Sequence, residues 1–222
     1  MSRAVLSIVA GTYNRCDQVQ RLVESVQRET KIPYILYITD AGSTDGTIEY
    51  LKSVESDIVR PIFVGKLLGQ AKAYNDVFKE VDTPYVCWLS DDNEVVNHGL
   101  DTAVAILAKD RKIGMVGLKV RDKVGPFTKA PYIGGVSSIG ILNVNQGVLP
   151  TKVMNAVGGF SEEFRDYGID PDITAKVLFH GYDVVYTRDV TIHHYRNWAE
   201  DKNTPEYKSL QAKHDRFRTL YE

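Results

Sequence analysis

The stretch VCWLSDDNEVV, residues Val86–Val96, decides the fold prediction because it joins a strand pattern directly to a cluster of acids. The apolar run Tyr85–Leu89 is rich in aromatic and β-branched residues, which is typical of a buried strand. Three acids follow it, Asp91, Asp92 and Glu94. Burying carboxylates without a positive partner costs several kcal/mol, so we expect a compensating charge. Mg²⁺ or Mn²⁺ suits this role because either cation is usually shared between one or two carboxylates and substrate phosphates. The alternative interpretation is a solvated polar turn.

Composition narrows the class of protein. With 222 residues, 43% apolar and 25% charged, the chain has the length and balance of one globular domain. The net charge of −2 argues against a nucleic-acid partner. No apolar run reaches the length of a membrane span, and the residues after Met1 show no signal-peptide pattern. Two cysteines, Cys16 and Cys87, fit a reducing compartment. These features together predict a cytoplasmic protein.

Strand and helix patterns alternate through the first half of the chain. Apolar runs that predict buried strands occur at 5–9, 35–39, 59–64, 85–89 and 115–118. Apolar residues at helical spacing separate them, for example Val19, Leu22, Val23 and Val26. Pro61 indicates an edge or irregular position for the third strand. This order predicts an α/β fold with a mostly parallel sheet and helices on both faces.

Polar clusters follow three of these strands, at Thr12–Arg15, Asp40–Asp45 and Ser90–Glu94. Open α/β sheets bind ligands beyond the carboxyl ends of their strands, so the three clusters predict one shared site for a nucleotide-type ligand. Neither a G-x-G-x-x-G fingerprint nor a P-loop is present. The binding of phosphates is therefore left to the metal and its acids.

Seven motifs, taken in order, resemble those of the family 2 glycosyltransferases of GT-A fold. They are GTYNR (11–15), DAGSTDGT (40–47), GQAKAYN (69–75), WLSDDNE (88–94), GGFSEEF (158–164), YGIDPD (167–172) and TIHHY (191–195). Each motif is weak alone, but the ordered set is strong. The resemblance implies a GT-A catalytic domain over residues 1–195, with a nucleotide-binding half to about residue 95 and an acceptor half after it. It also implies an inverting enzyme that uses a nucleotide-diphosphate sugar, with a UDP-sugar favoured, and a carbohydrate or glycoconjugate acceptor.

The same resemblance implies a set of nucleotide-binding residues. Asp40 would accept a hydrogen bond from an N–H of the base, and uracil offers such a donor. Its alternative role is an Asx turn that closes on Gly42, and both roles can coexist. Gly69 would let the backbone approach the ligand closely. The full predicted set is Thr12, Asn14, Arg15, Asp40, Gly69 and Asp91.

The family motif after the fourth strand is Asp-x-Asp, but this chain has Ser90 at the first acidic position. Asp92 fills the last position, and we predict that it binds the divalent cation directly. Asp91 is then expected to contact ribose or the metal shell. Neighbouring side chains on a strand point to opposite sides, so only one of His193 and His194 can face the site. The resemblance favours His193 as a further metal ligand; the alternative is a structural histidine.

The acid–base residue implied by the resemblance is Asp170, which would deprotonate the acceptor hydroxyl. The family pattern is Gly-Glu-Asp, whereas this chain has Ile169 before the aspartate. The alternative role for Asp170 is the N-cap of the following helix. Two other functions stay open. A non-catalytic sugar-nucleotide-binding module fits the departures at Ser90 and Ile169, and a nucleotidyltransferase on a related fold ranks last.

Two segments stand apart from this pattern. Residues 121–150 are rich in glycine and proline, and we expect them to border the acceptor pocket; a variable surface insertion is the alternative. Residues 196–222 mix aromatic residues with Lys and Arg. We expect this tail to be a helix packed on the core, with a homodimer contact or a peripheral membrane contact as alternatives.

Overall fold

A computed structural model describes residues 3–124, 128–134, 143–164 and 168–196, together with Pro205 and Lys208. Residues 121–150, expected to border the acceptor pocket, therefore lie partly outside the described residues, and the tail 196–222, expected to be helical, lies almost wholly outside them. In chain order the elements are β1 (Leu6–Thr12), α1 (Cys16–Glu29), β2 (Tyr34–Asp40), α2 (Thr47–Val54), β3 (Val59–Phe63), α3 (Gln70–Phe78), β4 (Tyr85–Ser90), β5 (Asn93–Val95), α4 (Gly99–Lys109), β6 (Ile113–Asp122), β7 (Gly147–Pro150), α5 (Thr151–Ala156), α6 (Ile169–Phe179) and β8 (Asp183–His194).

The strands form one sheet in the order β3-β2-β1-β4-β7-β6-β8-β5. The pairs among β1, β2, β3 and β4 are parallel, as predicted. As expected from Pro61, β3 is an edge strand, where a residue without a backbone N–H is tolerated. The other half is mixed, because β7 runs antiparallel to β4 and β6, and β5 runs antiparallel to β8. Four of the seven neighbouring strand pairs in the described residues are parallel, so the prediction of an α/β fold with a mostly parallel sheet is confirmed, and the antiparallel pairs lie in the second half.

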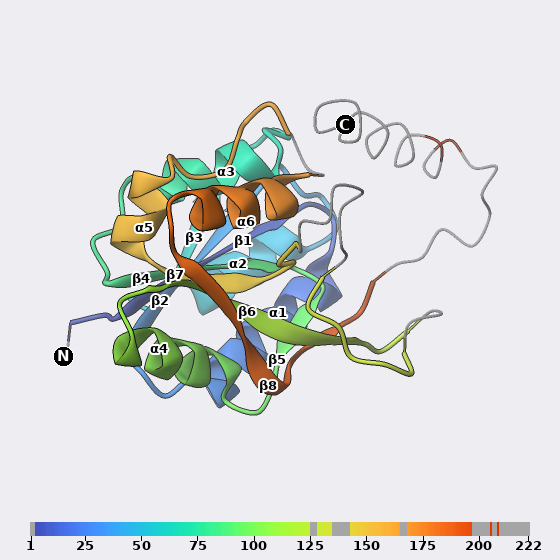
Figure 1. The fold of residues 1–222 in the computed structure, drawn as a ribbon. Coiled ribbons are helices and arrows are strands. Elements are labelled where there is room, and N and C mark those ends of the chain that lie inside the picture. Colours follow the sequence, from blue (N-terminus) through green and yellow to red (C-terminus); the bar gives the residue numbers. More distant parts are fainter. Residues whose placement is uncertain are drawn as a thin grey trace.

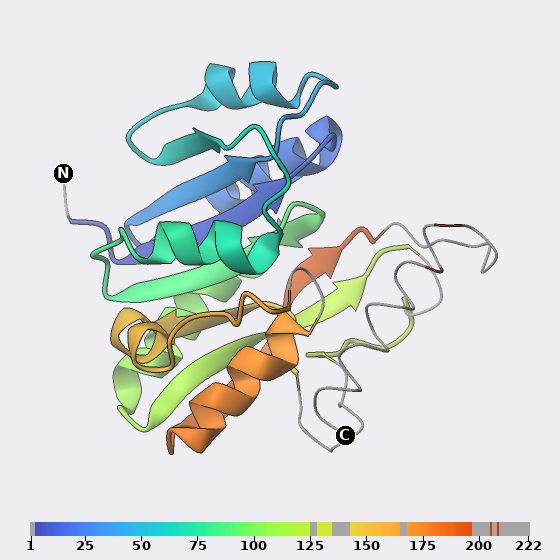
Figure 2. The ribbon, with the colours of Figure 1, turned by 90° about the horizontal axis from the view of Figure 1, so that it is seen from above.

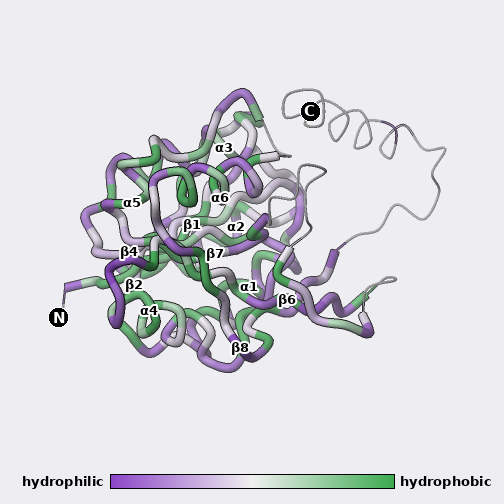
Figure 3. Tube along the Cα trace, in the orientation of Figure 1, coloured by the Kyte–Doolittle hydropathy of each residue, from purple (hydrophilic) through white to green (hydrophobic). Residues whose placement is uncertain are grey.

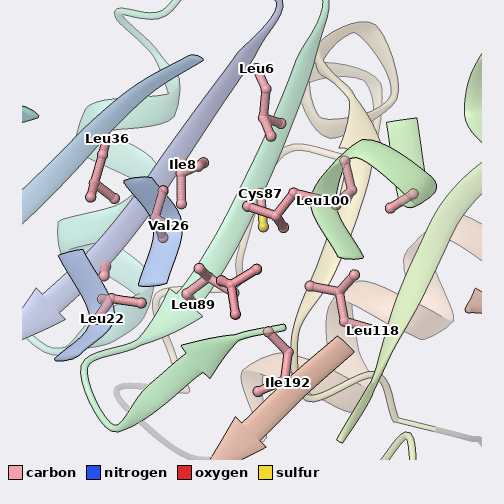
Figure 4. Close-up of a cluster of buried hydrophobic side chains, with 14 of the residues drawn as sticks. Leu6, Ile8, Leu22, Val26, Leu36, Cys87, Leu89, Leu100, Leu118 and Ile192 are labelled. Atoms are coloured by element: carbon pink, nitrogen blue, oxygen red, sulfur yellow. The ribbon is translucent and has the colours of Figure 1, made fainter. Parts of the chain in front are cut away.

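Helices cover both faces of the sheet (Figure 1). On one face α1, α2 and α4 pack on the strands, and Figure 4 shows Leu22 and Val26 of α1 and Leu100 of α4 meeting Leu89 and Cys87 of β4. Burying such a leucine contributes roughly 1.5–3 kcal/mol. On the other face lie α3, α5 and α6, and Figure 2 looks down on α3 and α6 above the strands. The helical spacing that predicted α1 is confirmed by its buried face.

The second core is centred on aromatic rings. The ring centroids of Trp88 and Phe160 are 5.5 Å apart in an edge-to-face arrangement, and those of Tyr74 and Phe160 are 6.1 Å apart. The Tyr74 hydroxyl donates to the Leu89 carbonyl oxygen (2.8 Å) and accepts from the Gly11 amide (3.2 Å). This side chain therefore joins α3 to the ends of both β1 and β4, next to the predicted site.

Hydrophobic residues concentrate in the central strands, and hydrophilic residues in the outer loops and helix surfaces (Figure 3). Among the described residues, none of the helices combines the length and the apolar character that crossing a membrane requires.

Candidate active site

The carboxyl ends of β1, β2 and β4 meet at one rim, which confirms the predicted convergence of the polar clusters. Thr12 pairs with Asp40 across β1 and β2, and Gly11 pairs with Ser90 across β1 and β4. The loop after β1 thus lies directly beside the acidic turn after β4. Parallel strand pairing is the physical reason, because it brings equivalent strand ends to the same edge.

The two predicted acids of this rim are buried, and both lie close to the guanidinium group of Arg15. Arg15 Nη1 lies 2.9 Å from Asp91 Oδ1 and 3.7 Å from Asp92 Oδ2. Asp91 is only 5% exposed, and burial raises its pKa to about 6, although Arg15 acts in the opposite direction. The sequence-based expectation of a compensating positive charge is met by Arg15 for Asp91.

His194, and not His193, faces Asp92. His194 Nε2 lies 3.1 Å from Asp92 Oδ1, whereas His193 Nδ1 lies 3.2 Å from Glu94 Oε2. Burial alone would raise the pKa of Asp92, but hydrogen bonding and charge from His194, with the charge of Arg15, bring it below the ordinary value.

The strand pairing explains which histidine faces the rim. His194 is paired with Asn93 of β5 and with Asp122 of β6, and His193 is paired with Glu94 and Arg121 in the same strands. Neighbouring residues of β8 alternate between the two sides of the sheet. Glu94 also receives Arg28 of α1 at 3.3 Å, so the His193 side is the side of that helix.

Polar side chains lie around Nδ1, the other ring nitrogen of His194. Its Nδ1 lies 3.1 Å from Asp122 Oδ1 and 3.2 Å from the Tyr132 hydroxyl. The Tyr132 hydroxyl donates to Asp122 Oδ1 (2.6 Å) and accepts from Arg196 Nη2 (3.2 Å). Sequence reasoning missed Asp122 and Tyr132. The one available signal was that Asp122 ends the apolar run of β6. Its contact with His194 follows only from the register between β6 and β8.

The donor atoms at the rim suit a shared cation better than a fully protein-bound one. Among the described residues, no three His, Cys, Asp or Glu side chains are grouped as a ready metal site. Asp92 Oδ1 and His194 Nε2 are nevertheless adjacent oxygen and nitrogen ligands, and Mg²⁺ or Mn²⁺ commonly takes its remaining ligands from substrate phosphates and water. The two residues therefore fit a cation that is held jointly with a phosphorylated ligand.

Asp40 occupies the Asx turn that was the alternative to base binding. It is completely buried, and its Oδ1 accepts from the amides of Gly42 (2.9 Å) and Ser43 (3.0 Å), while its Oδ2 accepts from the Ser43 hydroxyl. Ser43 Oγ in turn accepts from the backbone N–H of Asn14 (2.8 Å), and the Asn14 side-chain Oδ1 accepts from the backbone N–H of Thr44 (2.7 Å). These contacts lock the loops after β1 and β2 together.

The other predicted nucleotide residues lie at the end of β1, at the start of α1 and just before α3. Thr12 is the buried last residue of β1, and Gly69 precedes α3 with a φ of 89° that favours glycine. A pocket of about 330 Å³ opens at the start of α1, with Asn14 and Arg15 among its walls. Its other lining residues are Cys16, Asp17, Gln18 and Asp45.

Asp170 lies in the first turn of α6 but does not cap it. The N-cap is Gly168, with a φ of 92°, and no side chain caps the helix. Burial raises the pKa of Asp170 to about 8, although the nearby indole N–H of Trp88, which donates to the Asn145 carbonyl oxygen at 2.9 Å, and the charge of Arg196 act in the opposite direction. The pure N-cap interpretation is therefore wrong, and Asp170 is a partly buried carboxyl group near Trp88 with a raised pKa.

The helix that carries Asp170 is fixed through one turn. Lys176 Nζ lies 3.1 Å from Asp172 Oδ2 and donates to the Gly159 carbonyl oxygen at 3.1 Å. Asn75 of α3 donates to the Phe160 carbonyl oxygen (2.8 Å) and accepts from the Phe160 amide (2.9 Å). Lys176 is only partly exposed and links α6 to this turn.

Comparison with known proteins agrees with this geometry. The model of the family described as "Glycosyl transferase family 2" matches residues 7–167, which is more than half of the chain. A teichoic acid poly(glycerol phosphate) polymerase of Staphylococcus epidermidis is 28% identical over 98 residues, covering 43% of this chain and 14% of that protein. An uncharacterized glycosyltransferase of Nostoc is 27% identical over 114 residues, covering 50% of this chain and 35% of that protein.

Solved structures share the fold at low identity. TarS of S. aureus, in a complex with UDP-GlcNAc, superposes with a TM-score of 0.72 at 15% identity, covering 96% of this chain and 66% of that one. The mannosyltransferase PcManGT of Pyrobaculum calidifontis, in a complex with GDP-Man and Mn²⁺, gives 0.70 at 18% identity, covering 95% and 61%. This chain spans less than two thirds of the length of each of these four proteins. The chain belongs to glycosyl transferase family 2 and has the GT-A fold.

Proposed function

We propose that this chain transfers a sugar from a nucleotide-diphosphate sugar to an acceptor hydroxyl by an inverting single displacement. The observation that carries the proposal is the buried acid pair Asp91 and Asp92 at the tip of β4, contacted by Arg15 and His194. Asp92 and His194 offer adjacent oxygen and nitrogen ligands on the rim that the predicted nucleotide loops share, and a divalent cation held jointly with a diphosphate suits that pair.

The donor-side roles follow from position. Asp92 and His194 would hold the divalent cation, Mn²⁺ or Mg²⁺, and His194 takes the role that the sequence assigned to His193. When bound, the cation neutralises the charge that develops on the departing diphosphate. Asp91, fixed by Arg15, is left to contact ribose or the metal shell, and the loops locked by Asp40 and Asn14 form the base side of the pocket.

Asp170 would be the general base. What supports this role is proximity: Asp170 lies near Trp88 of β4, and the charges of both Asp170 and Asp91 act on Tyr74, whose hydroxyl contacts the Leu89 carbonyl oxygen. Ionised Asp170 accepts the proton of the acceptor hydroxyl as the hydroxyl oxygen attacks the anomeric carbon. A positioned base typically contributes ~10²–10⁴-fold to the rate.

A uridine nucleotide remains the favoured donor. A carboxylate near the base would suit the N–H of uracil, but Asp40 is completely buried in its turn, so this preference rests on the family resemblance and not on Asp40. The TarS complex contains UDP-GlcNAc and the PcManGT complex contains GDP-Man, which supports a nucleotide-sugar donor for the fold as a class. We propose a carbohydrate or glycoconjugate acceptor.

The test is calorimetric titration of the protein with UDP, GDP and dTDP, with and without Mn²⁺, followed by assays of sugar transfer. We expect Asp92→Ala to lose the Mn²⁺-dependent part of UDP binding and Asp170→Asn to retain it. Asp76→Ala serves as the control, because Asp76 is a half-exposed acid paired with Lys72 on α3. Equal loss of donor binding in the first two variants would contradict the proposed division of roles.

A non-catalytic nucleotide-sugar-binding module is the second candidate. Ser90, at the position of the first family acid, is used in a turn, where its amide donates to Asn93 Oδ1 at 2.9 Å. Donor binding without transfer or donor hydrolysis above background would favour this module over the enzyme.

A further inference from the structure

Asp122 is a buried acid for which the fold alone gives no reason. Its side chain is completely buried at the end of β6. Both of its hydrogen-bond contacts, with His194 Nδ1 and the Tyr132 hydroxyl, use Oδ1. Within the part of the chain that the structure describes, its Oδ2 has no hydrogen-bond partner. Burying a carboxylate with half of its capacity unmet is costly, so a purely structural role would be better served by an apolar or amide side chain.

The contacts around Nδ1 give this nitrogen of His194 hydrogen-bond acceptors of its own. Tyr132 has one hydroxyl hydrogen, and at 2.6 Å it is donated to Asp122 Oδ1. The Tyr132 oxygen is then an acceptor, since it also receives Arg196 Nη2 at 3.2 Å. Nδ1 of His194 therefore faces two oxygen acceptors. Nε2 also faces an acceptor, Asp92 Oδ1 at 3.1 Å, so each ring nitrogen has a carboxylate beside it. A cation bound between Asp92 and His194 would take the place of the hydrogen on Nε2, and Asp122 would keep the hydrogen on Nδ1.

We propose that Asp122 is the positioning residue that makes His194 a cation ligand, by accepting the Nδ1–H and presenting Nε2 to a divalent cation shared with Asp92. The inference rests on the proposed function, because it concerns the same cation. A carboxylate behind a ligating histidine fixes the ring orientation and raises the basicity of the ligand, and removing it typically lowers metal affinity roughly 10–100-fold.

The neighbouring histidine of β8, His193, offers a matched control, because it also has a carboxylate at its Nδ1. Glu94 contacts His193 Nδ1 at 3.2 Å, much as Asp122 contacts His194, but on the side of the sheet that faces α1. Glu94→Gln therefore removes a carboxylate from a histidine of β8 without touching the rim. If His193 were the metal ligand, this variant and not Asp122→Ala would weaken cation binding.

The experiment measures free Mn²⁺ by its electron paramagnetic resonance signal during titration of the full chain in the presence of UDP. We expect Asp122→Ala to weaken Mn²⁺ binding roughly 10–100-fold. Asp122→Asn, which keeps the volume and one acceptor, is expected to weaken it less, and Glu94→Gln to change it less than about twofold. Thermal unfolding confirms that each variant is folded, and if Asp122→Ala is not, Asp122→Asn decides.

A second readout separates the inference from the proposed function. In ¹⁵N-histidine NMR spectra of metal-free Asp92→Ala, which removes the carboxylate beside Nε2, neutral His194 should be the Nδ1–H tautomer, and adding Asp122→Ala should give a mixture of tautomers. If His194→Ala loses Mn²⁺ binding while both Asp122 variants keep it and the tautomer is unchanged, the role of Asp122 is refuted and the cation site stands. If Mn²⁺ binding is the same in His194→Ala as in the wild type, the metal assignment of the proposed function fails as well.

Discussion

Asp170 shows at the scale of one residue how burial sets the chemistry of the site. Its carboxyl group lies at the start of α6 against Trp88, and burial raises its pKa to about 8. Only the ionised form can accept a proton from an acceptor hydroxyl. The same burial that makes Asp170 a strong base therefore keeps it protonated at neutral pH, which makes its role measurable in two ways.

The first is the pH profile of activity. Because the base must be ionised, we expect kcat/KM to rise with pH and to level off above about pH 8, following the raised pKa of Asp170. Asp170→Asn should lower kcat ~10²–10⁴-fold and leave a profile without this rise. A wild-type profile that is already flat from pH 5 to pH 8 would argue against Asp170 as the base.

The second is the pH dependence of stability. An exposed aspartate ionises near pH 3.9 in the unfolded chain, whereas folded Asp170 keeps its proton to about pH 8. Between these values the folded state binds more protons, so the free energy of unfolding decreases as pH rises through this window. Asparagine cannot ionise, so the gain in Tm from Asp170→Asn should be larger at pH 8.5 than at pH 4.5. Equal differences in Tm at the two pH values would show that burial does not hold this proton.

At the scale of elements, α3 and α6 are joined through the turn that contains Gly158, Gly159 and Phe160. Asn75 is 6% exposed and pairs with both backbone groups of Phe160, while Lys176 donates to the Gly159 carbonyl oxygen. This turn thus fixes the helix that carries Asp170 relative to the helix that supports β1 and β4.

The two glycines of this turn allow a matched test. Both have positive φ, 77° at Gly158 and 67° at Gly159, so alanine is strained at either position. A Cβ at Gly158 would meet nothing within 4 Å, but one at Gly159 would lie 2.6 Å from Asn75 Oδ1. We expect Gly159→Ala to lower the Tm clearly more than Gly158→Ala. Similar losses of Tm would show that backbone strain alone matters and that the Asn75 contact does not.

Asn75→Ala tests the same junction from the other side. It would leave the buried amide and carbonyl groups of Phe160 without this partner, at a cost of about 1–3 kcal/mol for each group. We expect the free energy of unfolding, measured by denaturant unfolding, to fall by at least the cost of one such group, about 1–3 kcal/mol. Asn155→Ala is the control, because Asn155 is exposed on the neighbouring helix α5. If the two variants were equally stable, the contact of Asn75 with Phe160 would contribute little.

The elements also show where the sequence was sufficient. The strands β1 to β4 and their helices were predicted because each has a long apolar pattern and a clear turn after it. β5 has three residues within the acidic turn and β7 has four, so neither shows a readable period. The acids and Arg15 at the rim were predicted because they directly follow the strands β4 and β1 in the sequence. His194 and Asp122 are 72 residues apart, and only the register between β8 and β6 brings them together.

At the scale of the whole molecule, the site lies where the two halves of the sheet meet. The parallel half supplies Arg15 and the acids after β4, and the mixed half supplies His194 on β8 and Asp122 on β6. A ligand bound at this rim contacts both halves only in the folded state. Binding should therefore be measurable as added global stability.

We expect Mn²⁺ and UDP together to raise the Tm more than the sum of their separate effects, since the cation is shared between the protein and the diphosphate. A ligand at a concentration of 100 Kd adds about 2.7 kcal/mol to the free energy of unfolding. Asp92→Asn should lose the joint increment but keep the effect of UDP alone, and excess chelator should abolish the joint increment in the wild type. The half-exposed acid variant Asp76→Asn should behave as the wild type. Additive effects of Mn²⁺ and UDP in the wild type would mean that the cation and the nucleotide do not meet at this rim, and a joint increment that survives Asp92→Asn would place their meeting point elsewhere.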